Sequence, residues 1–354
     1  MVSIRDVVRE LERIAPPVYQ ESYDNAGLIT GDPAWEVTGI LTCLDSTEAV
    51  IDEAIARGCN LVVAHHPIIF KGLKRLTGRN YVERTVLKAI KNDVAIYAIH
   101  TNLDNVLHRG VNQRIGQRLG LERTRILAPK SVLRKLITYV PLTQCAPLRR
   151  ALLTEGAEAV AMLEQASLDT RQNGPQHEDN LNGRTVRMEV QYGYGAEREI
   201  LSTLHREHPH ESPFYEIAGI DNRLPQVGSG LVGQLPEPMR ETAFLDFLKD
   251  RMQVSCIRYT ALRQKNIETV ALCGGAGGFL LQQAIGAGAD IFITADYKYH
   301  EFFDADGQIV IADIGHFESE QFTIPLLKEI LSEKFTTFAT YSTEVRTNPI
   351  QYWC

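Results

Sequence analysis

Apolar and polar residues near the start of the chain recur with the period of a helix. The first residues, MVSIRDVVRELERIAPPVY, place apolar side chains three and four positions apart among charged ones. This spacing is typical of an amphipathic helix with one face on a core. A signal peptide would instead need an uninterrupted apolar stretch after a basic start. We therefore expect this segment to be the first helix of the folded protein.

Two longer segments share one order of elements. GILTCLDSTEAVIDEAIARGCNLVVAHHP, from Gly39, predicts a buried strand, a turn, a helix ended by a glycine, and a second strand. ETVALCGGAGGFLLQQAIGAGADIFITADYKYH, from Glu268, predicts the same order, and AIARGCNLVV matches AIGAGADIFI without a gap. Each segment has the pattern of a βαβ unit. The repetition predicts an internal duplication and therefore two related α/β halves.

The middle of the chain has a different pattern. KLITYVPL, VRMEVQYG and FYEIAGI are expected to be strands, and APLRRALLTEGA and EREILSTLHREHP are expected to be helices. The polar run at residues 164–184 predicts a loop. This order is typical of a separate α+β domain, so we expect it at 131–226, inserted between α/β halves at 1–130 and 227–354. The glycine-rich GSGLVGQLPEPM, from Gly228, is then expected to be a linker into the second half.

Composition narrows the class of protein. With 354 residues, 44% hydrophobic and 23% charged, the chain is expected to form more than one globular domain. A net charge of -7 argues against a nucleic-acid partner, because neutralising phosphates needs clustered Lys and Arg. No stretch approaches the roughly 20 apolar residues of a membrane-spanning helix. The six cysteines form no CxxC pair, which disfavours a disulfide framework or a thiolate zinc site. We therefore expect a soluble, cytoplasmic protein with no membrane partner.

Histidines and carboxylates recur where expected strands end. His65 and His66 end the segment LVVAHHP. The segments VAIYAIHTNLD and IVIADIGHFESE each run from a strand to a histidine that precedes an acidic residue by four positions, in the pairs His100 with Asp104 and His316 with Glu320. This spacing places both side chains on one face of a helical turn. Adjacent histidines alone would fit one buried and one exposed side chain equally well.

The residue types favour a site for two cations. Imidazoles of His65, His66 and His316, with carboxylates of Asp104 and Glu320, suit Zn, Fe, Mn, Co or Ni better than calcium. Five ligands are too many for one tetrahedral zinc but suit two divalent ions bridged by a carboxylate. We therefore predict a dinuclear metal site with these five ligands. His100 is expected to orient Asp104 or to act as a general acid or base, and not to be a ligand.

Other polar residues lie near these motifs. Asp296 and His300 could line the same cavity, although a solvated or capping His300 fits the spacing equally well. Glu318 is expected on an exposed face. Asp24 and Asn25 are expected to bond local backbone groups in a turn, with lining a cleft as the second alternative. CGGAGG, from Cys273, could cradle an anion at a helix N-terminus, or its glycines could allow tight packing between strand and helix.

The motifs together resemble one known family. YDNAGLITGDP, HHPIIFKGLKRLTG, IYAIHTNLD, CGGAGG, GHFESEQF and TNPI follow in the order of the NGG-one-interacting-factor-three family. Its members are often named GTP cyclohydrolase 1 type 2 homologues. The resemblance implies two related α/β domains around a dinuclear metal site with the five ligands named above. The inserted segment is similar to the ferredoxin-like PII and CutA folds. Long members form toroidal hexamers, so the resemblance also implies a homohexamer.

Three positions depart from the family pattern. Tyr23 stands where Trp is usual, Ala295 where Gly is frequent, and Leu231 where Arg is common.

The resemblance and the residues lead to two hypotheses for the function. The first hypothesis is a metal-dependent hydrolase in which an acidified water attacks a ring carbon or phosphoryl group of a nucleotide-like small molecule. The alternative is a non-catalytic metal-binding or regulatory interaction protein. Turnover by the metal-loaded protein separates the two.

Overall fold

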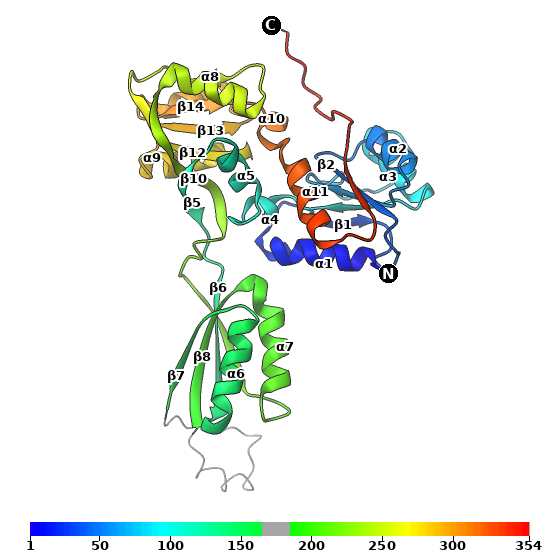
Figure 1. The fold of residues 1–354 in the computed structure, drawn as a ribbon, viewed down its shortest axis with the longest axis vertical. Coiled ribbons are helices and arrows are strands. Elements are labelled where there is room, and N and C mark those ends of the chain that lie inside the picture. Colours follow the sequence, from blue (N-terminus) through cyan, green and yellow to red (C-terminus); the bar gives the residue numbers. More distant parts are fainter. Residues whose placement is uncertain (165–184, 354) are drawn as a thin grey trace. The chain divides into compact units, whose positions relative to one another are not determined.

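The chain divides into two units, and the second is inserted into the sequence of the first. The computed structural model describes residues 1–164 and 185–353 (Figure 1). Unit 1 comprises Met1–Pro129 and Pro225–Cys354, and unit 2 comprises Lys130–Leu224. The predicted loop at residues 164–184 lies outside the described residues, apart from Glu164. Every helix among the described residues is too short or too polar to cross a bilayer.

The first sheet of unit 1 has five strands. Their bounds are Gly27–Thr30 for β1, Gly39–Cys43 for β2, Leu61–Ala64 for β3, Ala95–Ala98 for β4 and Ala339–Ser342 for β15. The order in the sheet is β1-β4-β3-β2-β15, and only the β1-β4 pair is antiparallel. All residues of β2, β3 and β4 are buried. Such continuous burial is typical of parallel strands covered by helices on both faces.

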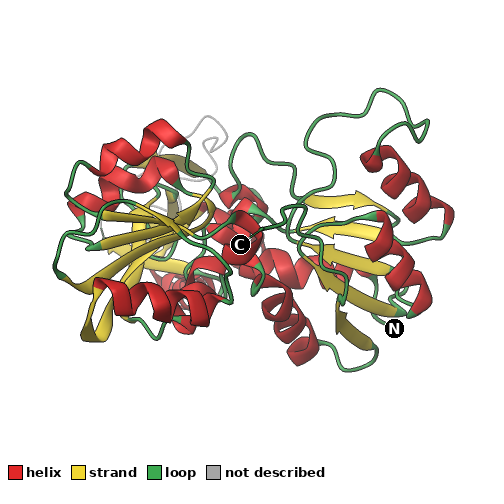
Figure 2. Ribbon diagram, turned by 90° about the horizontal axis from the view of Figure 1, so that it is seen from above, coloured by secondary structure: helices red, strands yellow, loops and turns green. Residues whose placement is uncertain are grey.

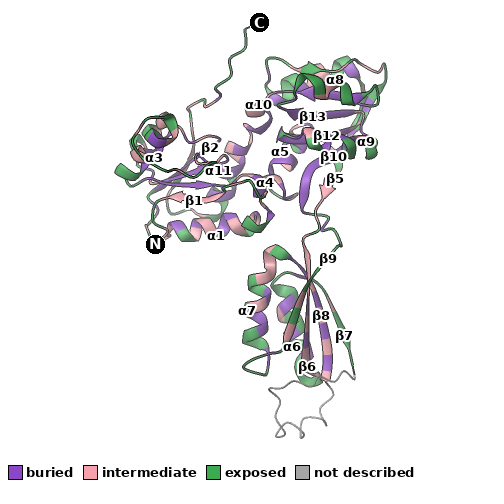
Figure 3. Ribbon diagram, turned by 180° about the vertical axis from the view of Figure 1, so that it is seen from behind, coloured by how far each residue is buried: buried purple, intermediate pink, exposed green. Residues whose placement is uncertain are grey.

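The second sheet of unit 1 has six strands. Their bounds are Glu122–Pro129 for β5, Gly228–Arg240 for β10, Arg258–Tyr259 for β11, Asn266–Ala276 for β12, Ile291–Ala295 for β13 and Val310–Asp313 for β14. The order is β11-β14-β13-β12-β10-β5, with β12, β13 and β14 parallel. Figure 2 shows helices beside the strands of both sheets, and Figure 3 shows their buried strands in purple.

The expected linker GSGLVGQLPEPM is a strand, which corrects the sequence-based prediction. It forms most of β10 and pairs with both β12 and β5. Its glycines serve close packing, because a Cβ at Gly228 would collide with the backbone of Ala128, and a Cβ at Gly233 would lie 3.0 Å from the carbonyl oxygen of Glu122. Glycine inside a strand often marks such a close approach of another backbone.

The helix of each predicted βαβ segment is present in unit 1, as α2 in the first segment and as η4 with α9 in the second. The α-helices are α1 Ile4–Ile14, α2 Glu48–Ala56, α3 Tyr81–Lys91, α4 Thr101–Asp104, α5 Val111–Arg118, α8 Glu241–Met252, α9 Leu281–Gly286, α10 His316–Glu320 and α11 Thr323–Lys334. The 3-10 helices are η1 Pro17–Tyr19, η4 Gly278–Leu280 and η5 Tyr299–Ala305. The predicted first helix is confirmed as α1. It begins at a capping box, in which the backbone N–H of Asp6 donates to Ser3 Oγ and the Ser3 N–H donates to Asp6 Oδ2.

The two sheets repeat one arrangement of parallel strands. Strands β2, β3 and β4 lie in the same relative order as β12, β13 and β14. Each sheet also takes a strand from the opposite end of the chain, since β15 joins the first sheet and β5 joins the second. The shared order agrees with the sequence repeat. The duplication itself, and the division at 1–130, 131–226 and 227–354, stay predictions.

The described residues of unit 2 form a four-stranded antiparallel sheet with two α-helices. Its elements are β6 Leu133–Pro141, α6 Leu142–Thr154, β7 Ala157–Leu163, β8 Thr185–Gly193, η3 Tyr194–Ala196, α7 Glu197–Glu207 and β9 Tyr215–Ile220. The chain order βαββαβ is that of a ferredoxin-like fold. Burial alternates along β8, so one face of the sheet packs on the helices. The first and last residues of the unit lie side by side, because the Leu224 N–H donates to the Lys130 carbonyl at 3.1 Å.

Candidate metal centre

The predicted ligands lie where parallel strands of unit 1 end. His65 and His66 directly follow β3, and α4, which follows β4, ends at Asp104. In the second sheet, α10 follows β14 and carries both His316 and Glu320. The carboxyl ends of neighbouring parallel strands open on the same edge of a sheet, where ligands usually bind. The structure brings these five side chains together.

One group of donor atoms joins the two sheets directly. His66 Nε2 lies 2.9 Å from Glu320 Oε2 and 3.3 Å from His316 Nε2. His316 Nε2 lies 3.2 Å from Glu320 Oε2. Within this group each residue offers a donor atom within 4.8 Å of the others. Three converging donors of two residue types are a suitable set for one cation.

A second group uses the other oxygen of the same glutamate. His65 Nε2 lies 3.6 Å from Asp104 Oδ1 and 3.8 Å from Glu320 Oε1. Among the described residues, neither His65 Nε2 nor Asp104 Oδ1 has a hydrogen-bond partner, although both atoms are buried. Buried polar atoms without partners are costly, so their convergence calls for a ligand. The donor set therefore fits a pair of cations that share the carboxylate of Glu320.

Hydrogen bonds on the far side of each ring fix the imidazoles. In every case Nδ1 is bonded to an oxygen at 2.7 to 2.9 Å, which leaves Nε2 as the nitrogen that can face a cation. The pairs are His65 with the Ile99 carbonyl, His66 with Asp45, His100 with Asp24, and His316 with Asp296. Since a carbonyl can only accept, His65 Nδ1 carries the proton and its Nε2 is free to bind.

Comparison with known proteins decides the family. A model of the family described as Duf34/NIF3 (NGG1p interacting factor 3) matches residues 2–349. The chain belongs to the Duf34/NIF3 family. The motif-based resemblance is thereby confirmed.

Relatives of this NIF3-family protein match it from end to end. A Staphylococcus epidermidis protein named GTP cyclohydrolase 1 type 2 homolog is 31% identical and aligns with 99% of this chain and 100% of its own. A Halalkalibacterium halodurans protein of the same name is 33% identical, with 96% and 94% covered. Among solved structures, a Bacillus cereus protein related to NIF3 has a TM-score of 0.84 at 30% identity, with 99% of each chain covered. A Staphylococcus aureus protein has a TM-score of 0.78 at 28% identity, also with 99% of each covered.

His100 lies beside the predicted ligands of the NIF3-family chain. Its ring centroid is 5.3 Å from those of His65 and His66, in edge-on contact with both. These three histidines also form a group of donor atoms within 4.8 Å of one another. The structure shows no side-chain hydrogen bond between His100 and Asp104 among the described residues. Its placement therefore fits a further donor or a proton carrier, and the acid–base role stays a prediction.

Two carboxylates that orient histidines were missed or misjudged from sequence. Asp45 follows β2 at the same edge as His66, and only this strand-end position could have suggested it. Asp24 does bond the neighbouring Asn25 N–H at 2.7 Å, as predicted for this turn. It also accepts from His100 Nδ1 at 2.8 Å and from the Thr101 N–H at 3.0 Å, across 76 and 77 residues. The local prediction for Asp24 was therefore incomplete.

Predictions for the second half had mixed outcomes. Asp296 contacts the site through its hydrogen bond with His316. His300 is exposed and lies against Tyr299, which favours the solvated alternative. The exposed position expected for Glu318 is wrong, because only 3% of this residue is exposed. Its Oε1 accepts from Asn348 Nδ2 at 2.8 Å, since residues far along the chain pack over α10.

The glycine-rich segment CGGAGG packs against the site. The N–H groups of Gly274, Gly275 and Gly277 donate to side-chain oxygens at 2.9 Å. The acceptors are Asn112 Oδ1, Ser319 Oγ and Thr294 Oγ1. Because these amides are already bonded within the protein, tight packing explains the glycines better than anion binding.

Charges in the centre shift one another's pKa values. Burial and the Glu320 carboxylate raise the pKa of Asp104 to about 7. Burial alone would lower the pKa of His66, but hydrogen bonds with Asp45 and Glu320 raise it to about 9. Burial is likewise outweighed at His316, where Glu320 and Asp296 raise the pKa to about 11. Burial would raise the pKa of Glu320, but His316 and His66 hold it well below its usual range.

Metal binding is expected to release protons. In the metal-free protein at pH 7.5, His66 and His316 hold protons because their pKa values lie near 9 and 11. A cation must displace them, so apparent affinity should rise with pH, up to about tenfold per unit for each proton released. Calorimetric titration with Zn²⁺ in buffers of different ionisation enthalpy should give one to two protons released. Release that is absent at pH 7.5 would contradict these pKa shifts.

The same shifts set the stability of the metal-free protein. A histidine whose pKa is raised by folding stabilises the folded state fully below its unfolded pKa, about 6.5. That contribution is lost as pH rises through about 9 for His66 and about 11 for His316. Chemical denaturation of the metal-free protein should therefore show this contribution declining from pH 7 to pH 10.

A cavity opens over the centre. Its volume is about 430 Å³. The residues that line it include His66, His100, Asp104, His316 and Glu320, which follow strands of both sheets of unit 1. Three aromatic side chains line it while remaining exposed, at 70% for Tyr23, 55% for Phe70 and 65% for Phe279. Exposed apolar side chains beside convergent polar groups are typical of a small-molecule site.

Proposed function

We propose that this NIF3-family protein binds two divalent cations and uses them to hydrolyse a nucleotide-like small molecule. The observation that carries the proposal is the pair of buried, unpartnered atoms, His65 Nε2 and Asp104 Oδ1, converging beside Glu320. His66 and His316 converge on the other oxygen of the same glutamate. A carboxylate shared by two donor groups is the arrangement expected of a dinuclear site.

The mixed nitrogen and oxygen donors favour Zn, Fe, Mn, Co or Ni over calcium. A bound pair of such cations would lower the pKa of water and polarise the bond to be cleaved. The protein holds its donors ready for them, because each imidazole is fixed by an oxygen on its Nδ1 side. His100 lines the cavity, and its remaining ring nitrogen could accept a proton from the substrate or return one.

The cavity walls support a substrate with a flat ring. Phe70 contacts the edge of His100, with ring centroids 5.9 Å apart, so one aromatic wall adjoins the donor cluster directly. Stacking of an aromatic side chain on a heterocyclic base contributes about 1–3 kcal/mol per base to the free energy of binding. The curated relatives bear the name GTP cyclohydrolase 1 type 2 homolog, and a guanine ring is a substrate of this kind. A purine nucleotide is therefore the first substrate to test.

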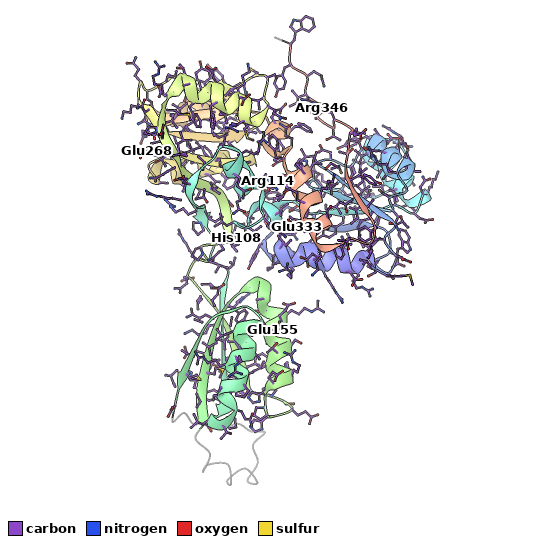
Figure 4. The ribbon with its side chains drawn as sticks, in the orientation of Figure 1. His108, Arg114, Glu155, Glu268, Glu333 and Arg346 are labelled. Atoms are coloured by element: carbon purple, nitrogen blue, oxygen red, sulfur yellow. The ribbon has the colours of Figure 1, made fainter. Side chains whose placement is uncertain are left out.

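The test is turnover by protein loaded in turn with Zn²⁺, Mn²⁺, Fe²⁺, Co²⁺ or Ni²⁺. We expect GTP or another nucleotide in a broad panel to be consumed, with products resolved by chromatography. His66→Ala should abolish the rate, because His66 contacts both Glu320 and His316. The matched control is His108→Ala, since His108 is exposed and remains outside the cavity lining (Figure 4).

Two outcomes would change the proposal. Protein that binds metal but turns over no nucleotide would favour the alternative of a non-catalytic metal-binding or regulatory interaction protein. Protein that binds no metal under gentle preparation would overturn the dinuclear centre itself. The homohexamer, the cytoplasmic location and the lack of a nucleic-acid partner stay predictions.

A further inference from the structure

A segment after the last strand connects the two sheets of unit 1 at the centre. We call residues 346–352 the strap. The strap follows β15 of the first sheet and reaches α10, which carries His316 and Glu320 beside the second sheet. Figure 4 labels Arg346 at its start. The Arg346 guanidinium lies over the Phe317 ring, 5.5 Å from its centroid.

The first contact of the strap reaches a histidine of the centre through one carboxylate. The hydroxyl of Thr347 donates to Asp45 Oδ2 at 2.6 Å, across 302 residues of sequence. Asp45 Oδ1 accepts from His66 Nδ1 at 2.8 Å. His66 Nε2 then lies 2.9 Å from Glu320. A continuous chain of hydrogen bonds therefore runs from the strap to the shared glutamate.

The second contact fixes the helix that carries the other donors. Asn348 is 6% exposed, and its Nδ2 donates to Glu318 Oε1 at 2.8 Å. Its Oδ1 accepts from the Ile350 N–H at 3.0 Å, which holds the side chain in place. Glu318 lies between His316 and Glu320 on α10. Neighbouring residues of the strap thus fasten a donor from the first sheet and the donor helix of the second.

We propose that Thr347 is a positioning residue for the metal centre. By holding Asp45 from its second oxygen, Thr347 keeps the carboxylate in the one orientation that presents His66 Nε2 to Glu320. Asn348, the next residue of the strap, holds α10 in place through its hydrogen bond to Glu318. Asn348 and Ile350 also line the cavity, so one segment sets both a wall for the substrate and the direction of a metal-binding ring. This inference rests on the proposed metal centre.

The experiment compares Thr347→Val with Thr347→Ser. Valine keeps the shape and removes the O–H donor, whereas serine keeps the donor. Each variant is titrated with Co²⁺ against a competing chelator, and the visible absorption of bound Co²⁺ is recorded. Because Thr347 acts on His66 through Asp45, we expect Thr347→Val to shift the spectrum and to weaken Co²⁺ binding about 10-fold, the lower end of the loss caused by removing a ligand's own hydrogen-bond partner. Thr347→Ser should stay within about threefold of the wild type.

Controls separate positioning from a merely structural role. Thr337→Val, at an exposed site before β15, should leave affinity and spectrum unchanged. If Thr347→Val fails to fold, Thr347→Ala replaces it, and Asp45→Asn tests the same hydrogen-bond chain from its other member. Wild-type protein that binds Co²⁺ while the folded variants bind it equally, with the same spectrum, would overturn the positioning role and leave the proposed function standing. Wild-type protein that binds no Co²⁺ would overturn both.

Discussion

Glutamine at position 320 is expected to remove both cations of the proposed dinuclear centre. Glu320 is 2% exposed and belongs to both donor groups of the centre. One of its oxygens faces His66 and His316, and the other faces His65. An amide is neutral and offers only one oxygen, so it cannot serve both groups. We expect metal affinity to fall more than about 100-fold, since a shared ligand is lost and not merely an outer contact.

Elemental analysis after dialysis, with a chelator-competition titration, measures this loss. The control is Glu333→Gln, because Glu333 is an exposed residue of α11 that pairs with Arg109 (Figure 4). This control should keep its metal. Two ions retained per chain in Glu320→Gln would show that the glutamate is not shared.

Alanine at position 275 is expected to weaken metal binding at the same proposed centre by displacing Glu320. Gly275 has a φ of +63°, and a Cβ there would collide with Glu320 Oε1 and lie 3.3 Å from the His316 ring. The glycine therefore leaves the space that the shared carboxylate occupies. We expect Gly275→Ala to lower metal affinity at least about tenfold because Glu320 must move. The left-handed backbone should also cost about 1–2 kcal/mol of stability.

Gly288→Ala isolates the effect of the collision. Gly288 has a φ of +74°, but a Cβ there would meet no atom within 4 Å. Both variants should lose stability in chemical denaturation through backbone strain, Gly275→Ala the more because of the collision, and only Gly275→Ala should lose metal affinity. Equal metal affinity in the two variants would refute the steric argument.

The elements of the fold were largely predictable from local patterns. The first helix, the parallel strands and the order of strands and helices in unit 2 each follow from side-chain periodicity within a few neighbouring residues. The convergence of the histidines and carboxylates was also foreseeable, because strands predicted to be parallel end at one edge. Their role as ligands stays a prediction until metal is measured.

Other features depend on contacts that local patterns do not contain. The glycines of β10 indicate a linker by composition, and only the adjoining strand β5 shows that they serve close packing. Glu318 is a charged residue between Phe317 and Ser319, and its neighbours in the sequence do not indicate that it is buried and accepts a hydrogen bond from Asn348. The bond between Thr347 and Asp45 spans 302 residues. Spacing rules describe neighbours along the chain and cannot reach such pairs.

Unit 2 is inserted in the connection between β5 and β10, two strands that pair with each other as the strands of a β-hairpin do. Pro129 at the end of β5 pairs with Gly228 at the start of β10, and these adjacent strands are antiparallel. Antiparallel neighbours can be joined by a tight turn of about two residues. Insertions or deletions within Lys130–Leu224 can therefore change unit 2 without breaking a backbone hydrogen bond of the ladder between β5 and β10.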